Sequence, residues 1–470
     1  MANHKSPIKF DMKNVVFVKP SKPIHSSILS LSTVDNRPDL DSISKVVCVY
    51  QSTNNHDFIV DQLDPTFVIK EALSKALLYY YPFAGRLVKY NDGNYRIHFN
   101  ADYGVPFMEA YADCHLSSLQ YMDGNDMEIS KYLVFDLPLE DKNGHQYPLL
   151  FKVTKFLCGG FTIGLGLSHR ICDGFGGAKF IKAMAELARG NSEPFVKPVW
   201  ERERLVGSIT TKQPFQILLD KASAATSPFG PNTTLVHECI KVDYDSIRRL
   251  KMKLVKENEN ENETMEHNFT TFEALGACVW RSRARALELN NKGKTILSIT
   301  MGMRGYLDPP LPEGYYGNAI MDAYLALTVR ELNEISLSKI AKLIRETKKA
   351  KNTVDCIKNS INTSYPSLNY FNNFCHAFTS LVDWTHLGLM EKIDFGGNKL
   401  VNMIPIPCEE SGSLYECIFT PPAKLDTSMK GGVKIFLSLP SAAMLKFKEE
   451  MEDLGLIKPF ARDWWVNDKS

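Results

Sequence analysis

The chain has 470 residues, of which 55 are lysine or arginine and 54 are aspartate or glutamate, so its formal net charge is +1. This length exceeds what one hydrophobic core supports and predicts two domains or two similar halves. The balanced charge excludes a chain-wide field that would attract nucleic acid or an anionic membrane. A hydrophobic fraction of 44% excludes a disordered chain.

The N-terminal segment and the cysteines bear on the cellular compartment. Residues 1–10 carry Lys5 and Lys9 but no apolar core of a signal peptide, and nowhere do about 18 apolar residues run together. We therefore expect a cytoplasmic protein that is neither secreted nor membrane-spanning. The 10 cysteines stand singly, without a C-x-x-C pair, so we expect reduced and mostly buried thiols.

The first clear element is a helix that starts at Asp64-Pro65. Asp64 suits the N-cap and Pro65 the first helical position, and apolar residues recur at helical spacing as far as Leu77. We expect the helix to end before Pro82, because a proline ring disfavours helical geometry in the preceding residue.

Two strand-like runs follow, at 149–156 and 161–168, separated by a Cys-Gly-Gly turn. In the second run, bulky Phe161, Ile163, Leu165 and Leu167 alternate with small residues. One face of this strand is therefore bulky and the other almost bare. We expect the bare face to leave room for a ligand near the end of the strand.

His169 directly follows that strand, and a glycine-rich turn at 174–177 leads from it into a helix that reaches about Arg189. The composition then turns polar and proline-rich. We predict an N-terminal half at 1–200, a crossover linker at 201–231 and a C-terminal half at 232–470.

The C-terminal half alternates strands and helices. Thr270 and Glu273 fit a capping box that opens a helix. Strands are predicted at 295–303 and 433–439, with helices near 336–349 and 442–454. The chain is thus of the mixed α/β class.

His169 is the candidate for chemistry, because a histidine titrates near neutrality and can take a proton and return it within one reaction cycle. Asp173 lies four residues later, so the two side chains could meet or find other partners. The plain alternative is a histidine satisfied by backbone groups at a strand end. The room predicted beside the strand strengthens the case for catalysis, and on the residues alone both interpretations stay open.

Other chemistries were weighed at the same place. A metal site would need a third ligand, and the other histidines show no ligand spacing, so we expect no metal. Cys172 could be a nucleophile, although a buried structural thiol is the better interpretation. The turn at 174–177 is typical of an anion-binding loop but lacks the lysine of a P-loop and the full dinucleotide fingerprint.

Two motifs connect the chain to a known family. His169-x-x-x-Asp173-Gly174 resembles the H-x-x-x-D-G motif of the plant BAHD acyltransferases, and the segment 394–398 resembles their D-F-G-W-G motif. Further segments occur in the order of the family: Leu31-Ser32-x-x-Asp35-Asn36, Tyr80 to Leu87, Phe272-Glu273-Ala274, Arg304, Pro309 to Pro312, Gly314 to Asn318, and Gly431-Gly432-Val433. Among branches, the chain looks nearest to the benzyl alcohol benzoyltransferases and the taxane acyltransferases.

The resemblance implies two chloramphenicol-acetyltransferase-like halves, each a mixed sheet flanked by helices, joined by the crossover. A channel would run between them, with His169 midway. Acyl-CoA would enter as co-substrate and a small-molecule alcohol as acceptor, with no cofactor, and the protein would act as a monomer. The implied activity is O-acylation of a plant specialised metabolite by a benzoyl, acetyl or related group. An amine-acylating enzyme and a catalytically silent metabolite-binding homologue stay open as alternatives.

The resemblance also assigns roles around the base. Asp173 and Asp394 belong to the two catalytic motifs in supporting roles, Asp173 by pairing with Arg304 and Asp394 by stabilising its own loop. Gly174 and Gly396 are the motif glycines that support these turns. Gly397 and Asn398 stand where the family usually has tryptophan and glycine. We expect this departure to change the loop and the shape of the channel.

Overall fold

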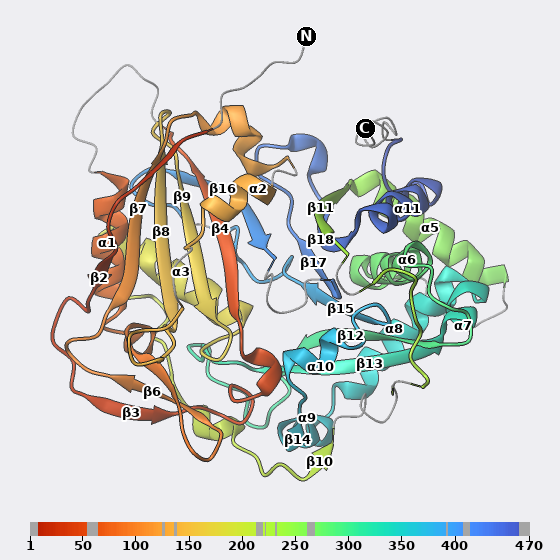
Figure 1. Cartoon of the computed structure of the whole chain (residues 1–470), viewed down its shortest axis with the longest axis horizontal. Coiled ribbons are helices and arrows are strands. Elements are labelled where there is room, and N and C mark those ends of the chain that lie inside the picture. The colour runs from red at the N-terminus through yellow and green to blue at the C-terminus, as the bar shows by residue number, and fades with distance from the viewer. Residues whose placement is uncertain are drawn as a thin grey trace.

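The computed structural model describes residues 8–53, 64–124, 127–135, 139–212, 220, 222–230, 233–260, 268–391, 393–407 and 414–459. Two lobes lie side by side, the first built mainly from the N-terminal part of the chain and the second from the C-terminal part (Figure 1). Each lobe has its own hydrophobic core, built around its own large sheet. The predicted two-halved architecture of mixed sheets flanked by helices is confirmed.

The first lobe is organised by a seven-stranded sheet. Its strands, in spatial order, are β1 (Phe10–Met12), β7 (Val105–Ala112), β8 (Leu149–Phe156), β9 (Phe161–Ser168), β4 (Ile43–Gln51) and β16 (Lys399–Ile406), and β2 (Val16–Val18) also pairs with β7. A small sheet holds β3 (Ser27–Ser30), β6 (Tyr95–Phe99) and β5 (Arg86–Lys89). The helices of this lobe are α1 (Pro65–Ala76), α2 (Met127–Tyr132) and α3 (Gly174–Ala188).

The second lobe is organised by a six-stranded sheet. Its strands, in spatial order, are β11 (Leu235–Val242), β18 (Val433–Pro440), β17 (Glu416–Thr420), β15 (Phe378–Asp383), β12 (Lys294–Gly302) and β13 (Ile320–Thr328). The helices of this part of the chain are α5 (Tyr244–Asn260), α6 (Thr271–Ala286), α7 (Val329–Glu334), α8 (Leu337–Lys351), α9 (Val354–Ile361), α10 (Leu368–Asn372) and α11 (Ser441–Asp453).

One strand crosses between the lobes. β16 comes from the C-terminal part of the chain but pairs antiparallel with β4, at the edge of the first sheet (Figure 1). Ile393, Phe395 and Leu400 therefore join the core of the first lobe. The division of the chain into halves at the crossover stays a prediction. A strict division there would assign β16 to the C-terminal half, although this strand pairs within the sheet of the first lobe.

From Thr211 onward, the described part of the crossover binds to the second lobe. Residues 213–219, 221 and 231 of the predicted linker lie outside the described residues. A short strand, β10 (Thr211–Lys212), pairs in parallel with β14 (Thr363–Ser364), and Ala224 bridges to Lys294 at the start of β12.

The predicted helix starts are confirmed by their caps. The Asp64 side chain accepts from the backbone N–H of Thr66 at the start of α1, and Thr270 and Glu273 form a reciprocal capping box at the start of α6. The glycine-rich segment differs from the expectation, because Gly174 to Gly177 form the first turn of α3 itself. Asp173 is the N-cap of that helix and accepts from Gly176 N–H at 3.0 Å.

The bare face of β9 was interpreted wrongly. A side chain at Gly164 would meet the backbone carbonyl of Leu133 at 2.0 Å, and one at Gly166 would press against Leu150 and Ile43. The protein's own segments therefore fill this face.

Within the described residues, no helix is long and apolar enough to cross a bilayer.

Candidate active site

His169 lies at the end of β9, where the two lobes meet. Its backbone N–H donates to the carbonyl of Ser42 at 2.9 Å, and its side chain is only partly buried. The imidazole lines two cavities, and Ser44 and Trp384 line the same two. His169 therefore lies at the junction of the two cavities. A catalytic group that acts on two bound reactants needs such a position.

The first cavity is apolar and has a volume of about 100 Å³. It lies in the first lobe, between the sheet and α3. Its walls include Val46, Leu165, Leu167, Phe180, Ile181, Leu400 and Met403. The bulky face of β9, and not the bare one, thus opens towards a possible ligand.

The second cavity has a volume of about 180 Å³, and we call it the polar cavity because charged and hydroxyl side chains line it beside apolar ones. It lies between the lobes, with side chains from β12, β13, β15 and β17 on one wall and from β4 and β16 on the other. Its charged residues are Arg37, Asp39, Lys45, Asp322 and Glu416. Three carboxylates face two cations here.

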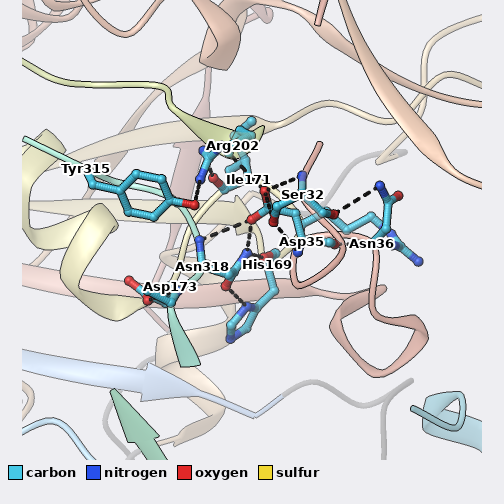
Figure 2. Close-up of polar contacts among 12 residues, drawn as sticks. Ser32, Asp35, Asn36, His169, Ile171, Asp173, Arg202, Tyr315 and Asn318 are labelled. Atoms are coloured by element: carbon cyan, nitrogen blue, oxygen red, sulfur yellow. Dashed lines mark hydrogen bonds and ion pairs between the residues drawn. The ribbon is translucent and has the colours of Figure 1, made fainter. Parts of the chain in front are cut away.

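Asn318 determines which nitrogen of His169 carries the proton. Its Nδ2 donates to the Oδ1 of Asp35 at 2.8 Å and to the backbone carbonyl of His169 at 2.7 Å (Figure 2). The amide oxygen must then face the Nδ1 of His169, 3.2 Å away, and accept its proton. Nε2 is left unprotonated, which is the state that a general base requires.

A buried ion pair holds Asn318 in turn. Asp35 is fully buried and also accepts from the backbone N–H of Asn318 at 3.1 Å, while its Oδ2 lies 3.4 Å from the Nε of Arg202. The guanidinium further donates to the carbonyl of Ile171 at 2.8 Å. Arg202 takes the space that a side chain at Gly317 would occupy, which explains the glycine. Asp35, Asn318 and Arg202 come from three distant segments of the chain.

The sequence reasoning missed these supporting residues as functional groups. Asp35 and Asn318 occurred only as parts of family segments, and Arg202 fell inside the predicted linker. No local signal marked Arg202, which stands in the charged segment 201–204. Their pairing could not be read from spacing, because Asp35 and Asn318 stand 283 positions apart.

Asp173 is engaged away from His169. Its Oδ1 lies 2.7 Å from the Nη2 of Arg304, and its Oδ2 accepts from the backbone N–H of Ala319 at 3.0 Å. Burial alone would raise the pKa of Asp173, but the Arg304 charge and these hydrogen bonds outweigh it and lower the pKa below 3.8. In the part of the chain that the structure describes, no hydrogen bond joins Asp173 to His169.

The rival chemistries find no support at this place. Burial raises the pKa of the Cys172 thiol well above its usual value, as expected of a structural thiol. Among the described residues, no group of three or more potential metal ligands is placed to hold an ion. At the turn, a side chain on Gly174 would meet Leu387 at 2.6 Å, and one on Gly176 would meet the carbonyl of Tyr316 at 2.0 Å. These glycines permit close packing against the second half of the chain.

The second motif forms a tight turn before β16. Gly396 and Gly397 have φ values of +55° and +82°, both are exposed, and Phe395 and Asn398 exchange backbone hydrogen bonds across them. Asp394 accepts from the backbone N–H of Leu400 at 3.3 Å. Asn398 is buried without a positive φ, so replacing the family's usual glycine causes no strain there.

The predicted effect of this turn on the channel stays untested. Neither Gly397 nor Asn398 is among the described residues that line the two cavities around His169. Asp394 likewise lines neither cavity. Asn398 instead donates from its side chain to the carbonyl of Phe395 at 3.2 Å, within the turn.

Two lobes around a histidine at the junction of two cavities define an acyltransferase of the chloramphenicol-acetyltransferase-like fold. Among solved structures, vinorine synthase matches with a TM-score of 0.72 at 22% identity, covering 96% of this chain and 99% of its own, which shows the fold. A model described as the Transferase family matches residues 8–454. The chain therefore belongs to the plant BAHD family of acyltransferases, as its motifs predicted.

Curated relatives cover nearly the whole chain. A spermidine coumaroyl-CoA acyltransferase of Arabidopsis thaliana is 39% identical, over 96% of this chain and 97% of its own. A taxadien-5-alpha-ol O-acetyltransferase of Taxus chinensis is 32% identical, over 95% of this chain and 97% of its own. Enzymes of this family use acyl-CoA as co-substrate and a small molecule as acceptor. The taxane likeness was predicted, whereas the stronger likeness to a polyamine enzyme was not.

Proposed function

We propose that this enzyme transfers an acyl group from acyl-CoA to an amino group of an aliphatic polyamine, forming an amide. The observation that carries this proposal is the excess of carboxylates over cations in the polar cavity beside His169. Amines of this class are cations at neutral pH, and such a cavity attracts them while it repels anionic acceptors. The relative named for spermidine, at 39% identity, supports the same class of acceptor.

In the proposed mechanism, His169 acts as general base through Nε2. The reacting nitrogen first loses its ammonium proton to water and attacks as the neutral amine, and His169 takes a second proton from it as it adds to the thioester carbonyl. The tetrahedral intermediate collapses, the C–S bond breaks, and the CoA thiolate takes the proton back from the imidazolium. Donor and acceptor meet in one space, so no acyl-enzyme intermediate is required.

The apolar cavity fits the acyl group of the donor in this proposal. Its walls are aliphatic and aromatic side chains from β9, α3 and β16. Such a surface favours a hydrophobic acyl chain or ring over a charged one, because the apolar area leaves water on binding. We therefore expect benzoyl or hydroxycinnamoyl donors to be preferred to acetyl-CoA.

Esterification of an alcohol is the second candidate, and it is the activity that the sequence alone favoured. The taxane relative at 32% identity supports it, and the same base would serve. A catalytically silent binding protein is the third. The ordered Asp35–Asn318–His169 arrangement argues against silence, because a binding protein has no use for a defined imidazole tautomer.

The test is a matrix of donors and acceptors with the purified enzyme. Acetyl-, benzoyl- and coumaroyl-CoA are each combined with spermidine, butylamine and benzyl alcohol, and products are identified by mass spectrometry. We expect coumaroyl- or benzoyl-spermidine amides as the main products. Esters without amides would move the assignment to the second candidate. If a thiol reagent detected no CoA release in any pair, the silent protein would be correct.

A further inference from the structure

Glu416 lies in a row of polar side chains that crosses the sheet of the second lobe. It pairs in register with Ser380 on β15, which pairs with Ser298 on β12, which pairs with Tyr324 on β13. Residues in direct register point to the same face of a sheet. All four line the polar cavity beside His169.

The other two carboxylates of this cavity, Asp39 and Asp322, already contact a cation. Arg37 forms ion pairs at 2.6 Å with both Asp39 and Asp322. Glu416 has no such partner among the described residues, and neither its carboxylate nor the Ser380 hydroxyl takes part in any hydrogen bond there. Desolvation raises the pKa of Glu416 to about 7, although the residue is only partly buried, because no cation offsets the loss of water.

The competing charges near Glu416 are accounted for. Lys45 lines the opposite wall of the cavity on β4, and no ion pair joins it to Glu416. On its other side, Glu416 borders a small cavity of about 40 Å³ that also contains His237 and Glu238. Glu238 is paired with Lys448 at 2.6 Å. Among the described residues, Glu416 is therefore the carboxylate of the polar cavity that contacts no cation.

We propose that Glu416, with the hydroxyls of Ser380 and Ser298, binds a second ammonium group of the acceptor, remote from the nitrogen that is acylated. This inference rests on the proposed function and extends it to a specificity-determining residue. A carboxylate flanked by hydroxyl groups supplies the acceptors that an ammonium ion needs when it leaves water.

The position of Glu416 also sets the length of the acceptor. Trp384, which lines both cavities with His169, lies four residues beyond Ser380, or roughly 13 Å along the strand direction. We therefore expect the anchored ammonium and the reacting nitrogen to lie several methylene groups apart in the acceptor. The site therefore favours a polyamine such as spermidine over short amines.

The experiment compares two acceptors in four enzymes. Spermidine carries remote ammonium groups and butylamine carries none, so their kcat/KM ratio isolates the proposed contact. Wild type is compared with Glu416→Gln, Glu416→Asp and the control Glu238→Gln, which alters an already paired carboxylate outside the polar cavity. We expect Glu416→Gln to lower kcat/KM for spermidine by about 10- to 100-fold and to leave butylamine within about twofold.

The remaining variants define the outcome further. Glu416→Asp keeps the charge on a shorter side chain and should retain part of the spermidine preference, while Glu238→Gln should match wild type. Equal losses for both amines in Glu416→Gln, or no loss for spermidine, would overturn the inference while amide formation itself stands. Wild-type enzyme that forms no amide with any amine would instead overturn the proposed function. Calorimetric titration of Glu416→Gln with spermidine, and separately with acyl-CoA, distinguishes lost acceptor binding from misfolding, since a folded variant still binds acyl-CoA.

Discussion

The Oδ1 of Asn318 lies 3.2 Å from the Nδ1 of His169, and the amide that carries it is locked by Asp35. Removing this acceptor in Asn318→Ala frees the imidazole to adopt either tautomer. Since one neutral hydrogen bond contributes about 0.5–1.5 kcal/mol, we expect kcat to fall by roughly 3- to 10-fold. KM for acyl-CoA should stay the same. Steady-state kinetics, with nitrogen NMR of the imidazole, measures both effects.

Ser32→Ala is the matched control for that variant. Ser32 donates to Asp35 at 2.8 Å but does not touch Asn318 or His169. Its loss should cost some stability and leave the tautomer unchanged. If Asn318→Ala kept the wild-type kcat and tautomer, the amide would have no role in orienting the base.

His169→Ala tests the base itself. General-base catalysis contributes about 10²- to 10⁴-fold, so kcat should fall by at least about 10²-fold. The side chain is partly exposed at a cavity, so the melting temperature should hardly change. Turnover near the wild-type value would remove His169 from the mechanism.

Asp173 and Arg304 should behave as a coupled pair. Breaking one partner of a buried pair costs on the order of 3–5 kcal/mol, so Asp173→Asn and Arg304→Ala should each lower the free energy of unfolding. In the double variant the two losses should fall short of their sum, by more than about 0.5 kcal/mol. Additive losses in chemical denaturation would show that the contact at 2.7 Å is energetically idle.

The same pair gives a pH dependence. The folded-state pKa of Asp173 is lowered from 3.8, so its stabilisation is present above that value and is lost as pH falls through the lower folded pKa. Wild type should lose stability on acidification below about pH 4 more steeply than Asp173→Asn. Parallel curves for the two proteins would contradict this assignment.

Glu416 should show the opposite sign. Its pKa is raised from 4.5 to about 7, so between these values the unfolded state releases a proton that the folded state keeps, and stability falls as pH rises. Glu416→Gln removes this loss. The variant should gain on the order of 1–3 kcal/mol over wild type at pH 8 and much less at pH 4.5, by melting temperature. If the difference in melting temperature between the variant and wild type stayed constant between these two pH values, another group and not Glu416 would titrate in this range.

Gly397→Trp separates two interpretations of the second motif. Because Gly397 has a φ of +82°, any other side chain there costs about 1–2 kcal/mol. We expect Gly397→Ala and Gly397→Trp to lose similar stability and to keep the wild-type ratio of kcat/KM for benzoyl- and acetyl-CoA. A selective loss with benzoyl-CoA in the tryptophan variant would instead support the channel-shape prediction.

Local signals predicted the elements of this fold well. Caps at Asp64 and Thr270 and the alternation in 161–168 gave the correct helices and strand, because they depend on neighbours within a few residues. The direction of the bare strand face was wrong, because what fills it comes from a distant segment, Leu133. The alternation of residues shows that the side chains on one face of the strand are small, but it does not show which segment covers that face.

The candidate site was predicted only as far as local signals and the family resemblance reach. His169 follows from its position after a strand, and the Asp173–Arg304 contact came only through the family resemblance. Asn318 and Glu416 were beyond reach, since their roles depend on sheet register and on ion pairs between segments more than 100 residues apart. A carboxylate without a cationic partner can be recognised only in the folded structure, where the ion pairs of the neighbouring cations are known.

The exchange of β16 between lobes has a consequence for biogenesis. β4 offers one edge to β9 early in synthesis, but its other edge finds its partner only when residues 399–406 have left the ribosome. Until then the N-terminal half exposes the unpaired edge of β4, and an unpaired strand edge is a template for aggregation. Strand pairings this distant in sequence also form slowly. Production of the N-terminal half alone should therefore yield insoluble protein, and co-expression of a segment that supplies β16 should rescue it.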